Sequence, residues 1–198
     1  MYKISISERT LHFKQPAGTS RGVYTTRHSY YLHLTSDEAP GVEGVGECAT
    51  LPDLSCDAKP EYEVTLRQIC QMVEQMGRIP YDMIRAYPSI TFGLETAFAS
   101  FFEAARSKYL LATHGDAAGQ GTIAVPAWAQ NLASLYDSPF ARGEEGITIN
   151  GLVWMGTYEE MLARLEEKLK AGFHCVKLKI GAIDFFKELD LIKRTYAA

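Results

Sequence analysis

Hydrophobic and polar residues alternate along the first quarter of the chain. Residues 2–14 and 23–35 follow this alternation and are rich in Tyr, Ile, Leu and Thr, and residues 42–48 continue it. Such a pattern is typical of strands with one buried face. The intervening segments 15–22 and 36–41 contain Pro and Gly and are expected to be loops. Three strands with short connections predict an antiparallel meander.

A helical period replaces the alternation after residue 56. The first helix is predicted to follow Asp57, an N-cap candidate, and to end at Gly77. A second helix is predicted over residues 91–108. The expected buried stripes are Leu66, Ile69, Cys70, Val73 and Met76 in the first helix and Leu94, Ala97, Phe98, Phe101 and Ala105 in the second. Residues 110–131 fit no element and have the character of an insertion.

Residues 137–146 have the composition of a linker, and a different order of elements follows them. Residues 147–155 predict a strand. Thr157 and Glu160 then form a capping box for a helix that ends at Gly172. A second strand lies around residues 174–181, and Asp184 could cap a last helix. The apolar stripes are Met161, Leu162, Leu165 and Leu169, and then Phe185, Leu189 and Ile192. Strand, helix, strand and helix in this order predict a parallel α/β unit.

Composition excludes several classes of function. The chain has 198 residues, 46% hydrophobic and 22% charged, as in an ordinary globular protein. A net charge of -4 gives no reason to expect a nucleic acid or an anionic membrane as partner. No apolar run is long enough to cross a bilayer, and the first residues lack the apolar core of a signal peptide. Four cysteines without a C-x-x-C pair favour reduced thiols and a cytoplasmic location.

Two lysines stand inside the second predicted α/β strand. Lys177 and Lys179 are two residues apart, so both point to one face of the strand, opposite Val176, Leu178 and Ile180. A strand between helices is usually buried on both faces, where two amines are costly unless they perform chemistry. A desolvated amine beside a second cation could act as a general base. A solvated strand face and a single Schiff-base lysine remain as alternatives.

Together, these features resemble the enolase superfamily, in its muconate-cycloisomerase-like branch. The match to that branch is carried by the Lys-x-Lys strand, residues 176–181. Within the branch the chain is most similar to the o-succinylbenzoate synthase family. Three further stretches suggest that family, namely residues 13–23, 46–55 and 140–156.

The resemblance implies a fold and its domains. Residues 1–131 would form an α+β capping domain, a three-stranded antiparallel meander plus helices. A linker would occupy 132–146, and residues 147–198 would hold the first two β/α units of an incomplete (β/α) barrel. A complete barrel takes about 250 residues, so truncation is expected here.

The resemblance also implies a reaction. Lys179 would remove the proton alpha to a carboxylate of a small-molecule substrate, and Lys177 would assist it and help to hold that carboxylate. In the family, Mg²⁺ stabilises the resulting enediolate, and loss of water gives o-succinylbenzoate for menaquinone synthesis. The substrate-binding positions would be Arg21, Pro52, Leu54, Ser55 and Trp154.

The sequence departs from the family in its metal ligands. The family holds Mg²⁺ with acidic residues on later barrel strands, which this chain does not contain. Asp184, Glu188 and Asp190 lie on the last helical pattern, where a cap and a solvated face are expected instead. We therefore expect no metal ligands and no Mg²⁺ binding by this chain alone, no synthase activity, and possible self-association through the exposed barrel edge.

Two alternatives to this function stay open. One is a different reaction of the superfamily, such as dipeptide epimerisation, N-acylamino-acid racemisation or muconate cycloisomerisation. The other is not an enzyme but a stand-alone cap that binds a small acid or a partner protein.

Overall fold

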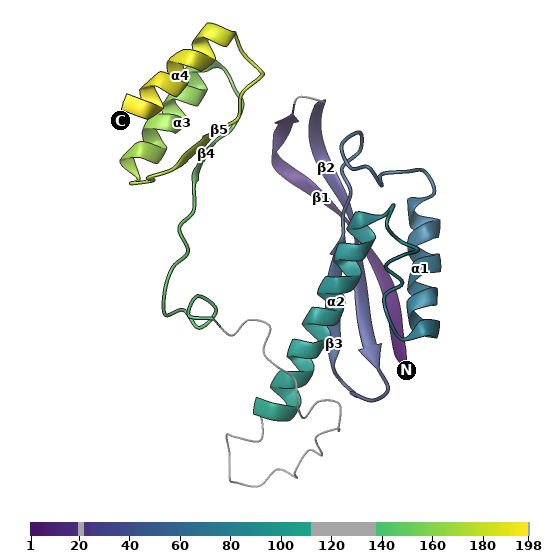
Figure 1. Cartoon of the computed structure of the whole chain (residues 1–198). Coiled ribbons are helices and arrows are strands. Elements are labelled where there is room, and N and C mark those ends of the chain that lie inside the picture. The colour runs from purple at the N-terminus through teal and green to yellow at the C-terminus, as the bar shows by residue number, and fades with distance from the viewer. Residues whose placement is uncertain (20–21, 112–137, 198) are drawn as a thin grey trace. The chain divides into compact units, whose positions relative to one another are not determined.

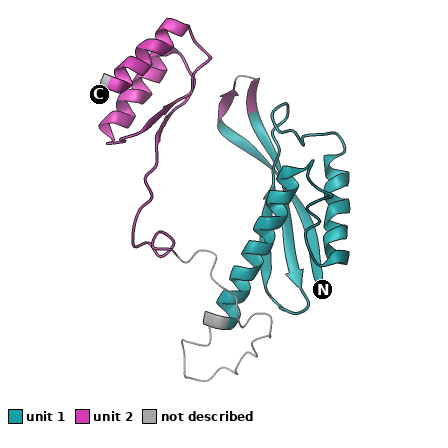
Figure 2. Ribbon diagram, viewed as in Figure 1, with its two compact units in different colours: residues 1–14, 25–137 teal, residues 15–24, 138–198 magenta. Residues whose placement is uncertain are grey.

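The computed structural model describes residues 1–19, 22–111 and 138–197. The chain divides into two compact units (Figures 1 and 2). The first comprises residues 1–14 and 25–137, and the second comprises residues 15–24 and 138–198.

The first unit is built on an antiparallel sheet. Its strands β1 (Tyr2–Thr19), β2 (Gly22–Ser36) and β3 (Glu43–Cys48) lie in the order β1-β2-β3. Strands β2 and β3 are antiparallel, with Leu32 opposite Gly46. The predicted three-stranded meander is therefore confirmed.

The predicted loop over residues 15–22 is wrong, because β1 continues to Thr19 and β2 starts at Gly22. In β1, residues 8–16 are all exposed. Pro16 and Gly18, which favour a loop in sequence, are therefore accommodated within a largely exposed strand.

Two helices cover one part of this sheet, α1 (Tyr62–Met76) and α2 (Pro88–Arg106), and a π-helical turn, η1 (Ser107–Leu111), follows α2. The predicted stripes are buried, except that Phe98 is partly buried and Met76 is 42% exposed. The core between helices and sheet includes Leu32, Leu34, Leu66, Val73, Leu94 and Phe101. Gly77 ends α1 in the left-handed conformation, at φ 66°, as predicted.

Asp57 does not cap α1, in contrast to the prediction. The residue before α1 is Glu61, whose side chain makes no capping hydrogen bond. Asp57 is instead 1% exposed, and its Oδ2 accepts hydrogen bonds from the backbone N–H of Ser89, at 2.8 Å, and from the Ser89 hydroxyl, at 2.6 Å. Because Ser89 lies in the first turn of α2, the carboxylate satisfies a free N–H of the second helix.

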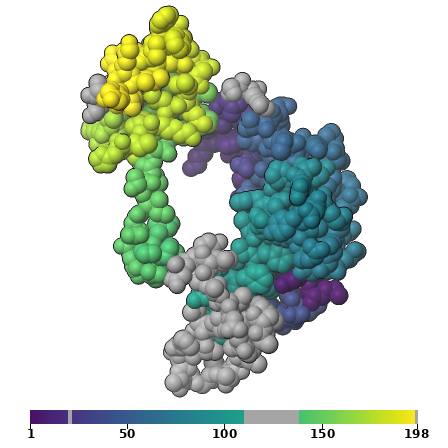
Figure 3. Space-filling view, in the orientation of Figure 1, coloured from purple at the N-terminus to yellow at the C-terminus, as the bar shows by residue number. Residues whose placement is uncertain are grey.

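The second unit contains two parallel strands and two helices. Strands β4 (Gly151–Val153) and β5 (Val176–Leu178) pair in parallel, and α3 (Tyr158–Lys170) and α4 (Phe185–Ala197) follow them. In Figure 3 the yellow-green to yellow atoms gather in one cluster, and the green atoms that precede them form a narrow extended segment. The core of this unit consists of Val153, Met161, Leu165 and Leu191.

Two local predictions for this unit are confirmed by hydrogen bonds. The Thr157–Glu160 capping box is complete, since each side chain accepts a hydrogen bond from the other residue's backbone N–H. The Asp184 carboxylate accepts from the backbone N–H groups of Phe186 and Lys187, which caps α4.

The predicted apolar stripe of α4 is wrong for Phe185 and Ile192, whereas Leu189 is half-buried. Phe185 is 63% exposed and Ile192 is 42% exposed, whereas Leu191 is 1% exposed. The buried face instead carries Glu188, at 7% exposure, together with Leu191. The prediction failed because Glu188 lies on the buried face of the helix, and a search for hydrophobic periodicity treats a glutamate as a solvent-exposed position.

Candidate functional site

The two lysines differ in their surroundings. On one face of β5, Val176 and Leu178 pack against the core of the second unit. On the other, Lys177 is exposed and Lys179 is half-buried. The expectation of a strand buried on both faces is therefore wrong for Lys177. The predicted alternation holds for Val176 and Leu178 but not for Ile180, which is 53% exposed, and the strand pair is parallel as predicted.

Lys179 lies beside the predicted substrate-binding residue Trp154. Its Nζ is 5.5 Å from the centroid of the Trp154 ring, within the range of a cation–π contact. The backbone N–H of Lys179 donates to the Val153 carbonyl at 3.0 Å. Because Trp154 follows Val153, this hydrogen bond places Lys179 and Trp154 together at the carboxyl ends of adjacent strands. The Trp154 indole N–H donates to the Gly18 carbonyl, at 3.1 Å, within the same unit.

Polar partners from the following helices hold the backbone at both strand ends. Arg164 Nη1, from α3, donates to the carbonyl oxygens of Trp154, at 3.1 Å, and of Met155, at 3.0 Å. Glu188 Oε1, from α4, accepts from the backbone N–H groups of Gly181, at 2.5 Å, and Ala182, at 3.2 Å.

Neither helix residue was predicted to take part in the site. Glu188 was predicted to be solvated, which is wrong, and Arg164 carries no signal in the sequence. The one available clue for Glu188 was its place in the first turn of a helix that starts just after the lysine strand.

The predicted residues of the capping loop lie in the first unit. Ser55 Oγ accepts from the backbone N–H of Leu51 at 3.0 Å and so closes its own turn, while the Leu54 side chain is 46% exposed. Asp53 has a φ of 60°, a conformation that is uncommon for residues other than glycine. Arg21 lies outside the described residues.

Pro52 contributes to a hollow of about 400 Å³ in the first unit. Strand β2 and the segment from Thr50 to Tyr62 form its walls. Its other lining residues are Thr26, His28, Tyr30, Thr50, Asp53, Ala58, Lys59 and Tyr62. The lining is mixed polar and aromatic.

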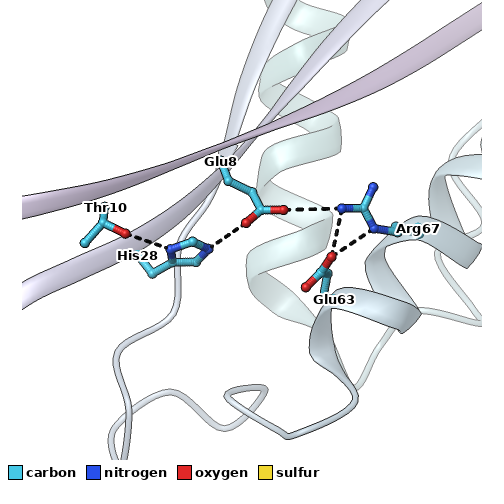
Figure 4. A network of polar contacts seen from close by, with 5 residues as sticks. All are labelled: Glu8, Thr10, His28, Glu63 and Arg67. Carbon is cyan, nitrogen blue, oxygen red and sulfur yellow. Dashed lines mark hydrogen bonds and ion pairs between the residues drawn. The ribbon is translucent and has the colours of Figure 1, made fainter.

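Beside this hollow, a chain of polar contacts crosses from the sheet to α1 (Figure 4). Thr10 pairs with His28 at 3.2 Å, and His28 with Glu8 at 3.5 Å. Arg67 then bridges Glu8, at 3.3 Å, and Glu63, at 2.8 Å. The side chains of Glu8, His28, Glu63 and Arg67 are all more than 40% exposed, so the network is a surface feature of modest energy.

The acidic groups of the described residues do not form a metal site. Within residues 1–19, 22–111 and 138–197, no three His, Cys, Asp or Glu side chains converge as a metal site requires. Asp190 is engaged by Tyr158, at 2.5 Å, and Arg194, at 2.7 Å. The hydrogen bond from Tyr158, and then that from Arg194, lowers the pKa of Asp190. The described residues therefore do not fit Mg²⁺.

Comparison with known proteins gives one curated relative and many similar folds. The chain is 32% identical over 221 residues to o-succinylbenzoate synthase of Desulfotalea psychrophila, a match that covers 96% of this chain and 52% of that protein. The chain has the fold of the capping domain of enolase-superfamily enzymes, with its parallel strand pair beyond. It spans about half the length of the curated relative that it matches. No family model matches.

Solved structures support the capping-domain fold. MenC from Desulfotalea psychrophila LSv54 superposes with a TM-score of 0.55 at 23% identity, over 97% of this chain and 52% of that one. The o-succinylbenzoate synthase from Thermosynechococcus elongatus BP-1, complexed with Mg in its active site, superposes with a TM-score of 0.57 at 22% identity. This match covers 100% of this chain and 48% of that one. A mandelate racemase/muconate lactonizing protein from Herpetosiphon aurantiacus superposes with a TM-score of 0.61 at 14% identity, over 98% of this chain and 49% of that one. The predicted resemblance and fold class are confirmed.

No membrane-crossing helix was found in the described part of the chain, since none there is both long and apolar enough.

Proposed function

We propose that this chain supplies the capping domain and the general base of a carbon-acid lyase of the o-succinylbenzoate synthase kind. The observation that carries the proposal is the half-buried Lys179, which lies against Trp154 at the carboxyl end of β5. The 32% identity to the Desulfotalea psychrophila enzyme supports the choice of reaction.

The domain division is part of the proposal. Residues 1–131 would form the cap, 132–146 the linker and 147–198 the first part of the barrel. The compactness of residues 138–198 supports a boundary near the proposed linker. Residues 15–24 group with this second unit, so the tip of the first hairpin would belong functionally with the barrel side.

In the proposed mechanism Lys179 takes the proton alpha to the substrate carboxylate. The Trp154 ring lies 5.5 Å from the amine, and exclusion of water from this side of the amine on substrate binding would strengthen electrostatic interactions at the reacting atoms. Lys177 lies on the same face and is exposed, so its ammonium is available to hold the carboxylate. Arg21, Pro52, Leu54 and Ser55 would supply further contacts from the capping loops.

The o-succinylbenzoate synthase from Thermosynechococcus elongatus is complexed with Mg in its active site, and a bound Mg²⁺ would supply stabilisation of negative charge that develops on the substrate carboxylate. The described residues of this chain offer no such ligand cluster, so no step here is assigned to the metal. We propose that residues 1–198 alone do not turn over substrate. Formation of o-succinylbenzoate by the purified chain in buffer with Mg²⁺ would contradict this statement.

A second candidate is another reaction that begins with the same proton transfer. An L-Ala-D/L-Glu epimerase superposes on 100% of this chain with a TM-score of 0.58, at 17% identity. A lysine base that removes a proton alpha to a carbonyl group serves epimerisation equally well. The two reactions therefore differ in the substrate contacts and not in the proposed base.

A chimeric enzyme tests both candidates. Residues 1–198 would replace the aligned half of the Desulfotalea psychrophila synthase, and product formation and solvent deuterium exchange at the alpha carbon would be measured. We expect o-succinylbenzoate to form, and Lys179→Ala to lower kcat by roughly 10²- to 10⁴-fold, the usual contribution of a general base. Lys177→Ala should raise KM more than it lowers kcat.

The matched control is Lys170→Ala, which removes an exposed lysine at the end of α3 and should leave both constants unchanged. A folded chimera in which Lys179→Ala retains full activity would rule out the proposed base. Racemisation of a dipeptide without o-succinylbenzoate formation would favour the second candidate.

A further inference from the structure

The segments that follow the two parallel strands are both fixed by charged side chains from the next helix. Glu188 is 7% exposed, and its Oε1 accepts from two successive N–H groups, those of Gly181 and Ala182. A buried carboxylate is tolerated when hydrogen bonds compensate its lost hydration. Gly181 has a φ of 100°, a conformation that favours glycine. Glu188 thus holds the backbone two residues beyond Lys179.

Arg164 performs the corresponding role after β4. It is half-buried, and one of its nitrogens, Nη1, reaches the carbonyl oxygens of both Trp154 and Met155. At Gly156, an added Cβ would lie 3.0 Å from that nitrogen and 2.5 Å from Glu160 Oε2. The residue after Met155 therefore leaves room for the guanidinium to reach the backbone.

From these contacts we infer that Glu188 and Arg164 are positioning residues that hold Lys179 and Trp154 in contact. The Arg164 contacts end on the backbone of Trp154 and Met155, and the Glu188 contacts end two and three residues beyond Lys179. Neither side chain belongs to the apolar core of Val153, Met161, Leu165 and Leu191. The inference rests on the proposed function only for the purpose of Lys179, since the geometry is independent of the reaction.

The distance between Lys179 and Trp154 can be monitored separately from stability. If Glu188 and Arg164 only stabilise the fold, their replacement should leave this distance unchanged. In the 198-residue chain with ¹³C-labelled lysine, the ring current of Trp154 should displace the ε-methylene signal of Lys179. That signal is assigned by its loss in Lys179→Arg, and the exposed Lys177 provides the internal reference. Loss of the contact is therefore visible in the folded protein without any measurement of activity.

Two conservative variants separate position from charge. Glu188→Gln keeps an oxygen at the same reach, so the Lys179 signal should keep its displacement. Glu188→Asp keeps the charge but shortens the side chain, so the Lys179 signal should move most of the way to the Lys177 reference. Arg164→Ala should move the Lys179 signal and the Trp154 indole N–H signal together.

The controls are Glu166→Ala on α3 and Lys193→Ala on α4, both exposed, which should leave every signal in place. If Glu188→Asp and Arg164→Ala lower the melting temperature but leave the Lys179 signal displaced, the inference is overturned. It is also overturned if no variant changes the melting temperature or the Lys179 signal. A moved signal in a chain whose chimera is inactive would retain the inference while rejecting the proposed function.

Discussion

The carboxylate of Asp57 and the amide and hydroxyl of Ser89 meet across 32 residues of sequence, with two hydrogen bonds from Ser89 to a single oxygen. The Tyr62 hydroxyl also pairs with the Ser89 hydroxyl, at 2.6 Å. These contacts tie the loop before α1 to the first turn of α2. The fold of the first unit therefore depends on a buried polar contact as well as on its apolar core.

Loss of this contact should destabilise the first unit. We expect Asp57→Ala to lower the free energy of unfolding by about 1–3 kcal/mol, because it removes the acceptor of the half-buried Ser89 N–H and hydroxyl. Urea denaturation followed by circular dichroism measures the change. Asp82→Ala is the control, since that side chain is 94% exposed. Equal midpoints for the two variants would show that the contact contributes no stability.

Close packing of α2 on β3 should make Gly46 irreplaceable. A Cβ at Gly46 would lie 1.8 Å from the Gly93 carbonyl oxygen and 2.8 Å from the Ala97 nitrogen. Both obstacles are backbone, so Gly46→Ala must separate strand and helix, at a cost on the order of 3 kcal/mol. Gly146→Ala meets nothing within 4 Å and should be neutral. A melting temperature of Gly46→Ala equal to that of the parent chain would contradict this packing.

Two buried thiols should make the fold sensitive to alkali. Desolvation by burial raises the pKa of Cys48 and of Cys70 from 9.0 to about 12. At a pH between 9 and about 12, the thiols have lost their protons in the unfolded chain and have kept them in the folded chain. Because the unfolded state then binds fewer protons, stability falls as pH rises, by about 1.4 kcal/mol per thiol per pH unit. Below pH 9 the thiols contribute no slope.

Urea midpoints measured from pH 7.5 to pH 10.5 test this window. A Cys48→Ala/Cys70→Ala double variant should lose less stability over the same range, whatever its stability at neutral pH. Cys56 and Cys175 are exposed, so their replacement should leave the slope as it is. Parallel curves for the parent chain and the buried-thiol variant would contradict the raised pKa values.

The capping box of α3 should contribute measurable local stability. Thr157→Ala removes the acceptor of the Glu160 N–H, at 3.2 Å, and should cost about 1 kcal/mol. Amide hydrogen exchange over α3 would report this as lower protection of its first turn. Thr157→Ser, which retains a hydroxyl, should restore the protection. Unchanged exchange in both variants would show that other contacts hold the helix start.

Much of this fold can be predicted from periodicity alone. The meander, both stripes of the first unit and the Thr157 cap follow from local patterns, because each element buries one regular face. The extension of β1 to Thr19 was missed because Pro16 and Gly18 are residue types typical of a loop. The partner of Asp57 was missed because an aspartate ahead of a helix does not show which helix it caps.

The candidate site was predicted only in part. The spacing of Lys177 and Lys179 fixes their shared face, and the parallel pairing of β4 and β5 places Trp154 beside Lys179. The roles of Arg164 and Glu188 could not be predicted, because a charged residue on a helix is usually solvated. Only tertiary contacts reveal that these two side chains turn toward the backbone of the preceding segments.

The assignment of residues 15–24 to the second unit has a practical consequence for dissecting the protein. The polypeptide passes from one unit to the other at three places, so no single cut separates them. A fragment that starts at residue 138 would leave behind the hairpin tip, including the Gly18 carbonyl that receives the Trp154 indole N–H. Reconstitution of the second unit would therefore require that both fragments be mixed.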